Sequence, residues 1–155
     1  MRKRFVALLL AMACITLGVF AENQQVRAEE TAGEDVEFSY LLTKDALIGY
    51  AELKNRGVYL AEGYSIINDA GAGKIGCGGI TNATVRCRVS VTAIVERKVN
   101  GSWARVTSWT QTNTNALRAS VSKYLSVTSG YYYRVRSSHY ASTDSSSSWT
   151  AGLWM

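Results

Sequence analysis

Residues 85–95 read VRCRVSVTAIV, and this stretch decides the fold class. Apolar side chains recur at every second position from Val85 to Val95, while Arg86 and Arg88 begin the opposite series. A period of two is typical of a β-strand with one buried and one solvated face. We therefore predict a half-buried strand here, with both arginines on its outer face.

The sequence after this strand predicts further strands separated by turns. Asn100-Gly101 is typical of a two-residue hairpin, because a type I′ turn needs positive φ at both positions. Ser129-Gly130 marks a second turn, and the polar segment 142–148 (STDSSSS) predicts a loop. The strands expected between these turns are Trp103–Thr112, Ala119–Val127, Tyr131–Tyr140 and Trp149–Trp154.

The residues before the central strand follow the same plan. Gly57–Ile67 predicts a strand, and the cluster Asp69–Gly73 predicts a turn. Phe38–Tyr50 is apolar without a clear period, so its state stays open. Regularly spaced strands without a competing amphipathic helix predict an all-β domain over residues 38–155. We expect a single immunoglobulin- or fibronectin-like antiparallel sandwich of about seven to eight strands.

The first 28 residues have the pattern of a helical secretory signal peptide. The basic start Arg2–Arg4 is followed by an uncharged apolar stretch, 5–20, shorter than the roughly 20 residues that a spanning helix needs. Small residues offer cleavage after Ala21 or after Ala28, and we favour the bond between Ala28 and Glu29. We expect a secreted, extracellular protein with no membrane span once cleaved; an uncleaved anchor is the alternative.

The acidic segment 29–37 (EETAGEDVE) predicts a flexible leader before the domain. The chain of 155 residues has 17 basic and 12 acidic residues, a net charge of +5. Residues 1–28 hold four of the basic residues and one acidic residue, so cleavage leaves 13 and 11, a net charge of +2. Export and this modest charge argue against nucleic-acid partners. The absence of proline excludes proline-rich ligand motifs and leaves the turns to Gly, Asn, Asp and Ser.

One local pattern resembles the tyrosine corner of fibronectin type III domains. Leu125 precedes Tyr131 by six residues, and Tyr131, Tyr133 and Val135 fall on one face. In that family, a tyrosine at this place hydrogen-bonds back across the corner, and a proline usually stands where this chain has Val127. The resemblance implies the fold class and no function.

A broader resemblance covers most of the chain after residue 28. The segments RGVYLA (56–61), GYSIINDAGAGKIG (63–76), GSW (101–103) and GYYYRVR (130–136) look like a family of small secreted proteins of unknown function from Gram-positive bacteria. The resemblance implies secretion and one β-rich domain. It supplies no catalytic or ligand-binding residues.

Cys77 and Cys87 remain after cleavage, and in an exported protein an even pair predicts a disulfide. A hairpin turning at Thr81–Ala83 would place them opposite each other on two strands. Two reduced thiols are the alternative.

Catalytic and metal-binding residues are sparse. His139 is the only histidine, and Ser137, Ser138 and Asp144 are its candidate partners. No GxSxG elbow, phosphate-binding glycine loop or paired-carboxylate pattern accompanies them. Zinc ligation by His139 with the two cysteines has the ligand types but no motif spacing. We therefore expect no enzymatic activity, cofactor or metal, and a surface or loop-end position for His139.

Basic and aromatic residues give the better candidate site. Tyr132, Arg134 and Arg136 share one face of their predicted strand. If this strand neighbours 85–95, they form one cationic patch with Arg86 and Arg88. Ordinary solubilisation of outer strand faces is the competing explanation.

The last strand adds an aromatic side chain to this candidate site. Trp149 and Trp154 have opposite parity, so an uninterrupted strand exposes one of them, and Trp154 is the candidate for stacking on a ligand.

These features predict a secreted, non-enzymatic binding module of the cell envelope or host surface. Its expected partner is an anionic envelope polymer, a glycan or a host surface protein. A secreted antimicrobial or pore-forming protein is the alternative, with strands such as Thr107–Thr114 rearranging into a membrane hairpin. A small hydrolase ranks third.

Overall fold

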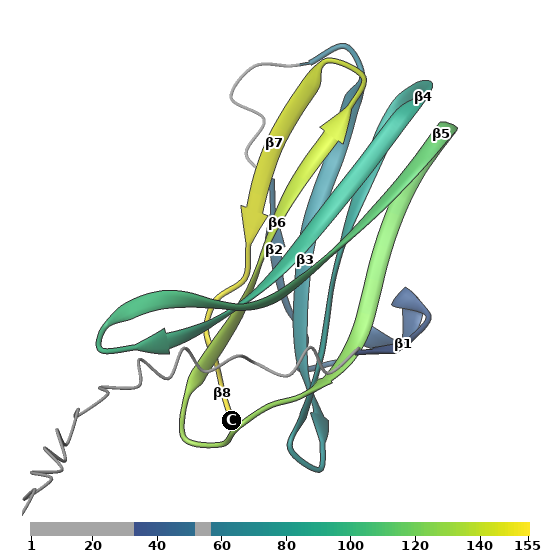
Figure 1. The fold of residues 1–155 in the computed structure, drawn as a ribbon. Helices are drawn as coiled ribbons and strands as arrows, with labels where there is room; N and C mark the ends of the chain where they lie inside the picture. The colour runs from purple at the N-terminus through teal and green to yellow at the C-terminus, as the bar shows by residue number, and fades with distance from the viewer. Residues whose placement is uncertain (1–32, 52–56) are drawn as a thin grey trace, which may run out of the picture.

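A computed structural model of the protein describes residues 33–51 and 57–155, which form an antiparallel sheet of eight strands (Figure 1). The predicted signal peptide and its cleavage point at Ala28 and Glu29 lie outside these residues. No helix within the described ranges is long and apolar enough to cross a membrane. The all-β prediction is confirmed.

The described residues contain eight strands and one 3-10 helix. In chain order they are β1 (Glu34–Asp35), η1 (Phe38–Leu41), β2 (Leu47–Tyr50), β3 (Leu60–Gly71), β4 (Lys74–Val99), β5 (Ser102–Ser126), β6 (Tyr132–Ala141), β7 (Asp144–Trp149) and β8 (Leu153–Trp154). The apolar stretch whose state stayed open thus holds the 3-10 helix η1 and the edge strand β2.

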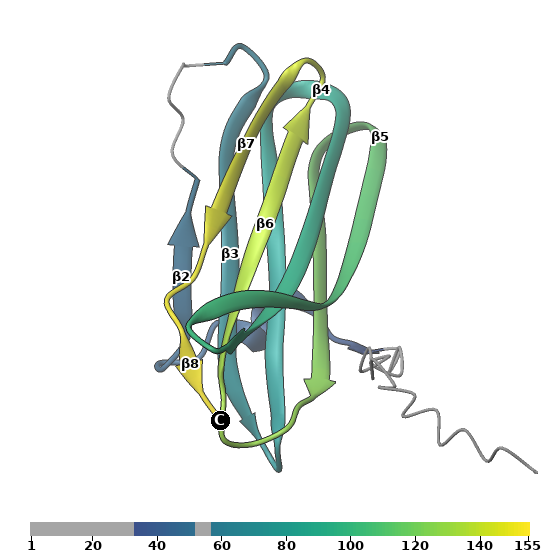
Figure 2. The ribbon, with the colours of Figure 1, turned by 60° about the vertical axis from the view of Figure 1, so that its left-hand side comes forward.

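The long strand β4 belongs to both halves of the sheet. Its first part, 74–83, pairs with β3, and its second part, 89–97, pairs with β6. Between them β4 bends sharply and runs back, and β5 bends beside it (Figure 2). Thr81 Oγ1 therefore donates to the Ser90 carbonyl of the same strand at 2.9 Å.

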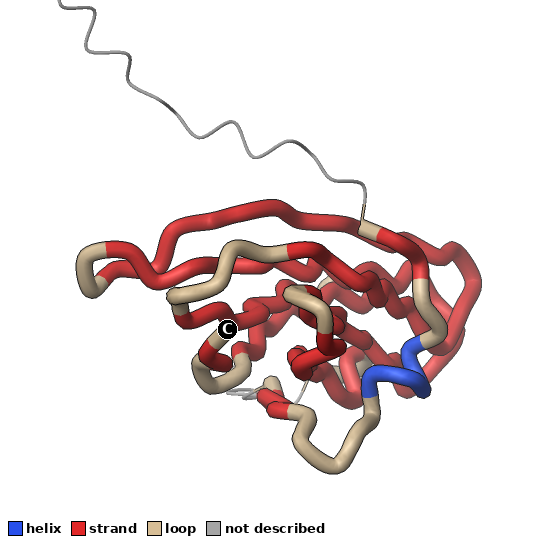
Figure 3. The backbone as a smooth tube through the Cα atoms, turned by 90° about the horizontal axis from the view of Figure 1, so that it is seen from below, coloured by secondary structure: helices blue, strands red, loops and turns tan. Residues whose placement is uncertain are grey.

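This bend folds the sheet over, so that β3 faces β6 and β7. One half is ordered β1-β5-β4-β3-β2; in the other, β6 joins β4 to β7 and β8. Helix η1 lies beside the sheet (Figure 3). The core between the halves is apolar, with Ile67, Ile75, Cys77, Ala93, Val95, Leu125, Tyr133 and Val135 fully or nearly fully buried.

The central period-two pattern is largely confirmed. Val89, Val91 and Val95 are buried, as their parity predicts. Val85 is exposed instead, because it lies at the bend of β4, outside the packed halves. The predicted hairpin is also confirmed, with φ of 50° at Asn100 and 83° at Gly101.

Three predictions about local structure are wrong. Residues 142–148 are not a loop: Asp144–Trp149 forms β7, paired with β6, because alternate serines face inward and outward. The strands expected at 103–112 and 119–127 are one strand, β5. Of the expected flexible leader 29–37, the structure describes only 33–37, which contains β1, and the Asp35 carboxylate of β1 lies 2.6 Å from Lys123 Nζ.

A corner hydrogen bond forms where the resemblance to fibronectin domains placed one, but from another tyrosine. Tyr133, fully buried, donates its hydroxyl to the Thr128 carbonyl at 2.8 Å. Tyr131 is half-buried instead, and the Arg97 guanidinium lies 4.5 Å from its ring centre. Tyr131 precedes β6 and lies at the edge of the core, whereas Tyr133 and Val135 lie within the strand and are buried in the core.

Candidate functional site

The candidate site is an aromatic–basic patch on the outer face of the half that contains β6. We define the patch by Lys98 on β4, Trp103 on β5, Tyr132, Arg134 and Arg136 on β6, and Trp154 on β8. Strand register brings these residues together, because Lys98 pairs with Trp103 across the hairpin and Tyr132 pairs with Trp154.

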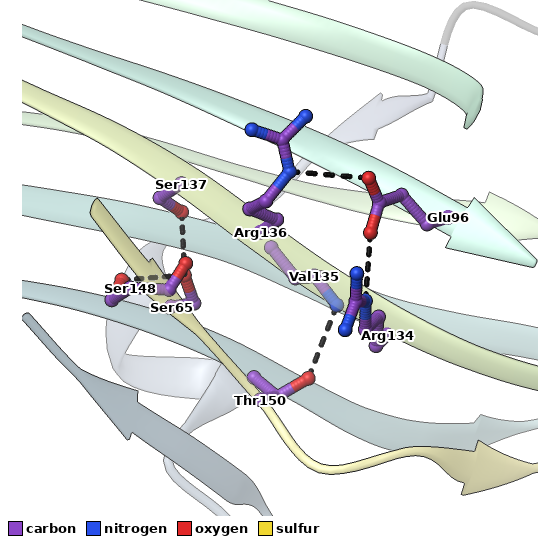
Figure 4. Close-up of polar contacts among 8 residues, drawn as sticks. All are labelled: Ser65, Glu96, Arg134, Val135, Arg136, Ser137, Ser148 and Thr150. Carbon is purple, nitrogen blue, oxygen red and sulfur yellow. Dashed lines mark hydrogen bonds and ion pairs between the residues drawn. The ribbon is translucent and has the colours of Figure 1, made fainter. Parts of the chain in front are cut away.

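Two arginines of the patch share one carboxylate (Figure 4). Arg134 Nε lies 2.7 Å from one oxygen of Glu96, and Arg136 Nε lies 3.1 Å from the other. Glu96 is only 7% exposed, so this shared pairing keeps its charge from being buried alone. Its negative charge offsets one arginine and leaves the other uncompensated.

Other cations surround this pair. Lys98 belongs to the patch, and Arg105 is in register with Glu96 on the neighbouring strand. The four cations and one carboxylate of this region therefore carry a net charge of +3. Such a cluster attracts anions and concentrates them at the surface.

Aromatic rings lie beside two of these cations. The Arg134 guanidinium lies 4.4 Å from the Trp103 ring centre, and Lys98 Nζ lies 5.9 Å from it. Tyr132 and Trp154 meet edge to face at 4.9 Å. Lys98, Trp103 and Tyr132 line a hollow of about 210 Å³ together with Gly152, where a Cβ would lie 3.3 Å from the Trp103 ring. The hollow can take an anionic group beside a ring that stacks.

The predicted link to Arg86 and Arg88 is wrong, although β4 and β6 are neighbours as it required. Arg136 is in register with Ile94, six residues beyond Arg88, or roughly 20 Å along a strand. Arg86 lies at the bend and donates to the Asn115 carbonyl at 3.2 Å. These two arginines therefore do not join the patch.

The predicted last strand is interrupted. It ends at Trp149 and resumes at Leu153, and between them Thr150 turns inward, where its Oγ1 accepts a hydrogen bond from Val135 N–H at 3.1 Å. The interruption breaks the parity argument, so both tryptophans are exposed, Trp149 by 51% and Trp154 by 57%.

Sequence reasoning missed Lys98 and Trp103. They flank the Asn100-Gly101 turn symmetrically, and pairing across a two-residue hairpin puts such residues on the same face. The signal was therefore present in the hairpin register.

A buried polar network lies between the two halves of the sheet. Ser65 Oγ lies 2.8 Å from Ser137 Oγ and 2.7 Å from Ser148 Oγ (Figure 4). His139 Nε2 lies 2.8 Å from Ser148 Oγ, and its Nδ1 lies 2.9 Å from Thr81 Oγ1. The expected surface position of His139 is therefore wrong, because it is 1% exposed.

The network fixes the protonation of His139. The single hydroxyl proton of Thr81 goes to the Ser90 carbonyl, so Nδ1 donates to Thr81 and Nε2 accepts from Ser148. Burial lowers the pKa of His139 from 6.5 to about 4. The ring is neutral at pH 7.

The candidate catalytic partners are not assembled around His139. Asp144 accepts hydrogen bonds from the backbone N–H groups of Tyr59 and Leu60, at 2.6 and 3.0 Å. Ser138 is exposed, whereas Ser137 joins the network through Ser65. Among the described residues, no three His, Cys, Asp or Glu side chains gather to hold a metal ion.

The predicted Cys77–Cys87 disulfide is wrong; both thiols are free. The strand does turn back, but as a bend between halves centred beyond residue 83. Cys77 pairs with Lys123 five residues before the bend begins at Asn82, roughly 16 Å along the strand. Cys87 lies within the bend. A disulfide needs Cα atoms within about 7 Å.

We expect alkylation to distinguish the two thiols. Burial raises the pKa of Cys77 to about 12, whereas Cys87 is half-buried. Iodoacetamide applied to unreduced folded protein should label Cys87 and spare Cys77 until denaturant is added, because a buried thiol is neither accessible nor ionised. Peptide mapping by mass spectrometry measures this, and a Cys77–Cys87 cross-linked peptide would contradict it.

Comparison with known proteins gives a family and one distant fold. A model with the description "Family of unknown function (DUF6147)" matches residues 28–152. No curated protein matches. The solution structure of CsgH from R. palustris is similar with a TM-score of 0.40 and 16% identity, over 56% of this chain and 86% of that chain. This is a weak likeness between two β-rich chains.

Proposed function

We propose a function for this chain, which belongs to the family of unknown function DUF6147. It is a secreted, non-enzymatic module that binds an anionic polymer of the cell surface through the aromatic–basic patch. The observation that carries the proposal is the arrangement at Glu96. Two arginines share its one carboxylate beside exposed rings, so the patch keeps positive charge next to stacking surfaces.

The chemistry of the patch favours phosphate or carboxylate groups on a sugar chain. Arginine side chains bind such groups through charge-assisted hydrogen bonds. Tyr132 and Trp154 offer ring faces and edges beside those cations, and sugar rings pack against aromatic surfaces. The extended strand face suits a linear polymer better than a compact ligand.

Three further parts of the proposal rest on the sequence. The basic start and short apolar stretch of residues 1–28 support secretion, and the family match begins at residue 28. The resemblance to secreted Gram-positive proteins supports a cell-envelope setting. An immunoglobulin- or fibronectin-like sandwich is supported by the two facing sheet halves and the Tyr133 corner.

Retention on immobilised wall teichoic acid, with uncharged dextran as reference, tests the proposal. Trp154→Ala and Lys98→Ala should each weaken binding by about threefold to tenfold, because each removes one exposed contact of the patch. These variants are preferable to Arg134→Ala, which would leave Glu96 with one partner. Raising the salt concentration should weaken binding, since exposed charges are screened.

Arg88→Ala is the matched control, because it removes the same charge roughly 20 Å from the patch. It should leave retention unchanged at constant ionic strength. Equal weakening by Arg88→Ala and Lys98→Ala would show binding by net charge alone. Absence of retention above the dextran reference would refute the proposal.

A further inference from the structure

The other half of the sheet carries a second hollow, on its outer face. Register arranges this face in rows across the strands. Ile48 on β2 pairs with Ile66 on β3, and the next row runs Tyr50, Tyr64 and Ile80 across β2, β3 and β4. These side chains give the face an apolar floor in which Ile66 and Ile80 are buried, and no strand of the described residues covers it.

The segment around η1 walls one end of this floor. Asn68 Nδ2 donates to the Leu41 carbonyl at 3.2 Å and lies 3.3 Å from Thr43 Oγ1, which holds the segment against β3. Leu41 is fully buried there, whereas Phe38 and Leu42 line the hollow. We call the resulting depression the apolar groove; it has a volume of about 520 Å³.

The apolar groove leaves hydrophobic surface open to solvent. Leu42 is 58% exposed and Tyr50 is 68% exposed, and the rings of Tyr50 and Tyr64 meet edge to face at 5.6 Å. Contiguous apolar surface beside a concave site is typical of ligand binding. The volume lies within the range of about 300–1,000 Å³ that small-molecule sites occupy.

The opposite end of the groove is polar. Its third row is Glu62, Asn82 and Arg118 on β3, β4 and β5. Asn82 Nδ2 lies 3.3 Å from a Glu62 oxygen, and Tyr64 donates its hydroxyl to the same oxygen. These hydrogen bonds lower the pKa of Glu62, so its carboxylate is ionised and already has donors.

Arg118 is the charge at this end that remains to be matched. Among the described residues, its guanidinium makes no ion pair or hydrogen bond. From Ile66 to Glu62 the groove runs four residues along β3, roughly 13 Å, from apolar floor to polar end. An apolar channel of this length with one unmatched cation at its end complements a chain with an anionic head.

We propose that the apolar groove binds a long-chain carboxylate of the fatty-acid class. The hydrocarbon chain lies against the exposed side chains of Ile48, Tyr50 and Leu42, above the buried Ile66 and Ile80. The carboxylate lies at Arg118, where the guanidinium donates to it. This site is on the half of the sheet opposite the aromatic–basic patch, so it is a second binding activity that does not depend on the function proposed for the patch.

Titration with cis-parinaric acid, whose fluorescence rises in an apolar site, tests this on the full chain. We expect saturable binding of one molecule per chain. Arg118→Ala should weaken parinarate binding about tenfold, which is the loss of one charge-assisted hydrogen bond. Arg118→Lys should restore most of it. The uncharged methyl ester should bind wild type and Arg118→Ala equally.

Ile48→Glu tests the groove itself, because it puts a carboxylate on the floor at a position that is already partly exposed. It should abolish binding of both acid and ester while circular dichroism keeps the strand signal. Arg86→Ala, an exposed arginine at the bend, should bind both ligands like wild type.

Several results would overturn the proposal. One is the absence of saturable fluorescence with wild type, and another is equal loss of acid and ester in Arg118→Ala. A third is a wild-type protein that does not bind parinarate and forms a dimer in sedimentation velocity, when Ile48→Glu dissociates that dimer. That result would assign the face to a second copy of the chain. None of these outcomes changes retention on teichoic acid, so failure here and failure of the proposed function are distinguishable.

Discussion

Gly49→Ala is expected to destabilise the protein by about 3 kcal/mol, at the upper end of overpacking effects. Gly49 lies on the inner side of β2, against the end of β7. A Cβ added there would lie 1.8 Å from the Trp149 carbonyl oxygen and 2.9 Å from the Thr150 backbone nitrogen. Backbone atoms cannot rotate away as a side chain can, so one of the two strands has to move.

Movement of either strand disturbs more than one contact. Thr150 holds the chain between β7 and β8 through its hydrogen bond with Val135. On the other side, β2 carries Ile48 and Tyr50 of the apolar groove. Urea unfolding followed by tryptophan fluorescence measures the loss of stability directly.

Gly152→Ala is the matched control. The atoms nearest to its Cβ would belong to the side-chain rings of Trp103 and Tyr132, at 3.3 and 3.4 Å, which can give by small rotations. We expect a change below about 1 kcal/mol, as for most surface substitutions. Equal unfolding midpoints for Gly49→Ala and wild type would mean that β2 does not pack against β7.

Local sequence patterns were sufficient to predict the all-β fold class. The alternation through 85–95 requires a strand with one buried face, and Asn100-Gly101 requires a hairpin, whatever the rest of the chain does. These signals depend on neighbouring residues only. For that reason the central part of β4 and its turn into β5 were predicted correctly.

The bends and register could not be predicted in the same way. Nothing local shows that β4 continues through Thr81–Ala83 and folds back after it, because the fold-back is stabilised by contacts with β6 and β3. The serines of β7 look like a loop in sequence. They form a strand because Ser148 finds Ser65 and His139 as buried hydrogen-bonding partners far along the chain.

The candidate site was predictable to the extent that it depends on parity within one strand. Tyr132, Arg134 and Arg136 do share an outer face. Their distance from Arg88 depends on the register between β4 and β6, which a single sequence does not define. The role of Glu96 also depends on that register, because its outward position alone does not select its partners.

Acidification from pH 7.5 to 5 is expected to destabilise the protein through His139. The imidazole is buried and neutral, with a pKa of about 4 in the folded protein against 6.5 when exposed. Below pH 6.5 the unfolded chain therefore binds a proton that the folded protein excludes, and stability falls as pH falls toward 4. Above pH 6.5 neither state binds it, and this contribution is fully present.

The size of the effect follows from the two pKa values. Their difference corresponds to about 3 kcal/mol when the pH has fallen through the whole range, and to about 2 kcal/mol at pH 5. Urea unfolding at pH 7.5, 6.5, 5.5 and 5 measures it. The measurements stop at pH 5 because protonation of Glu62, whose pKa is lowered in the folded protein, affects stability only at lower pH.

His139→Gln is the control, because the chain has one histidine and glutamine keeps hydrogen-bonding groups without titrating. The variant should be less stable than wild type at pH 7.5, since Thr81 and Ser148 lose well-placed partners, yet nearly independent of pH between 7.5 and 5. The two stability curves should therefore converge as the pH falls. Parallel curves for wild type and His139→Gln would mean that His139 also takes up a proton in the folded protein between pH 7.5 and 5. The network between the two halves of the sheet would then have to open to admit the charge.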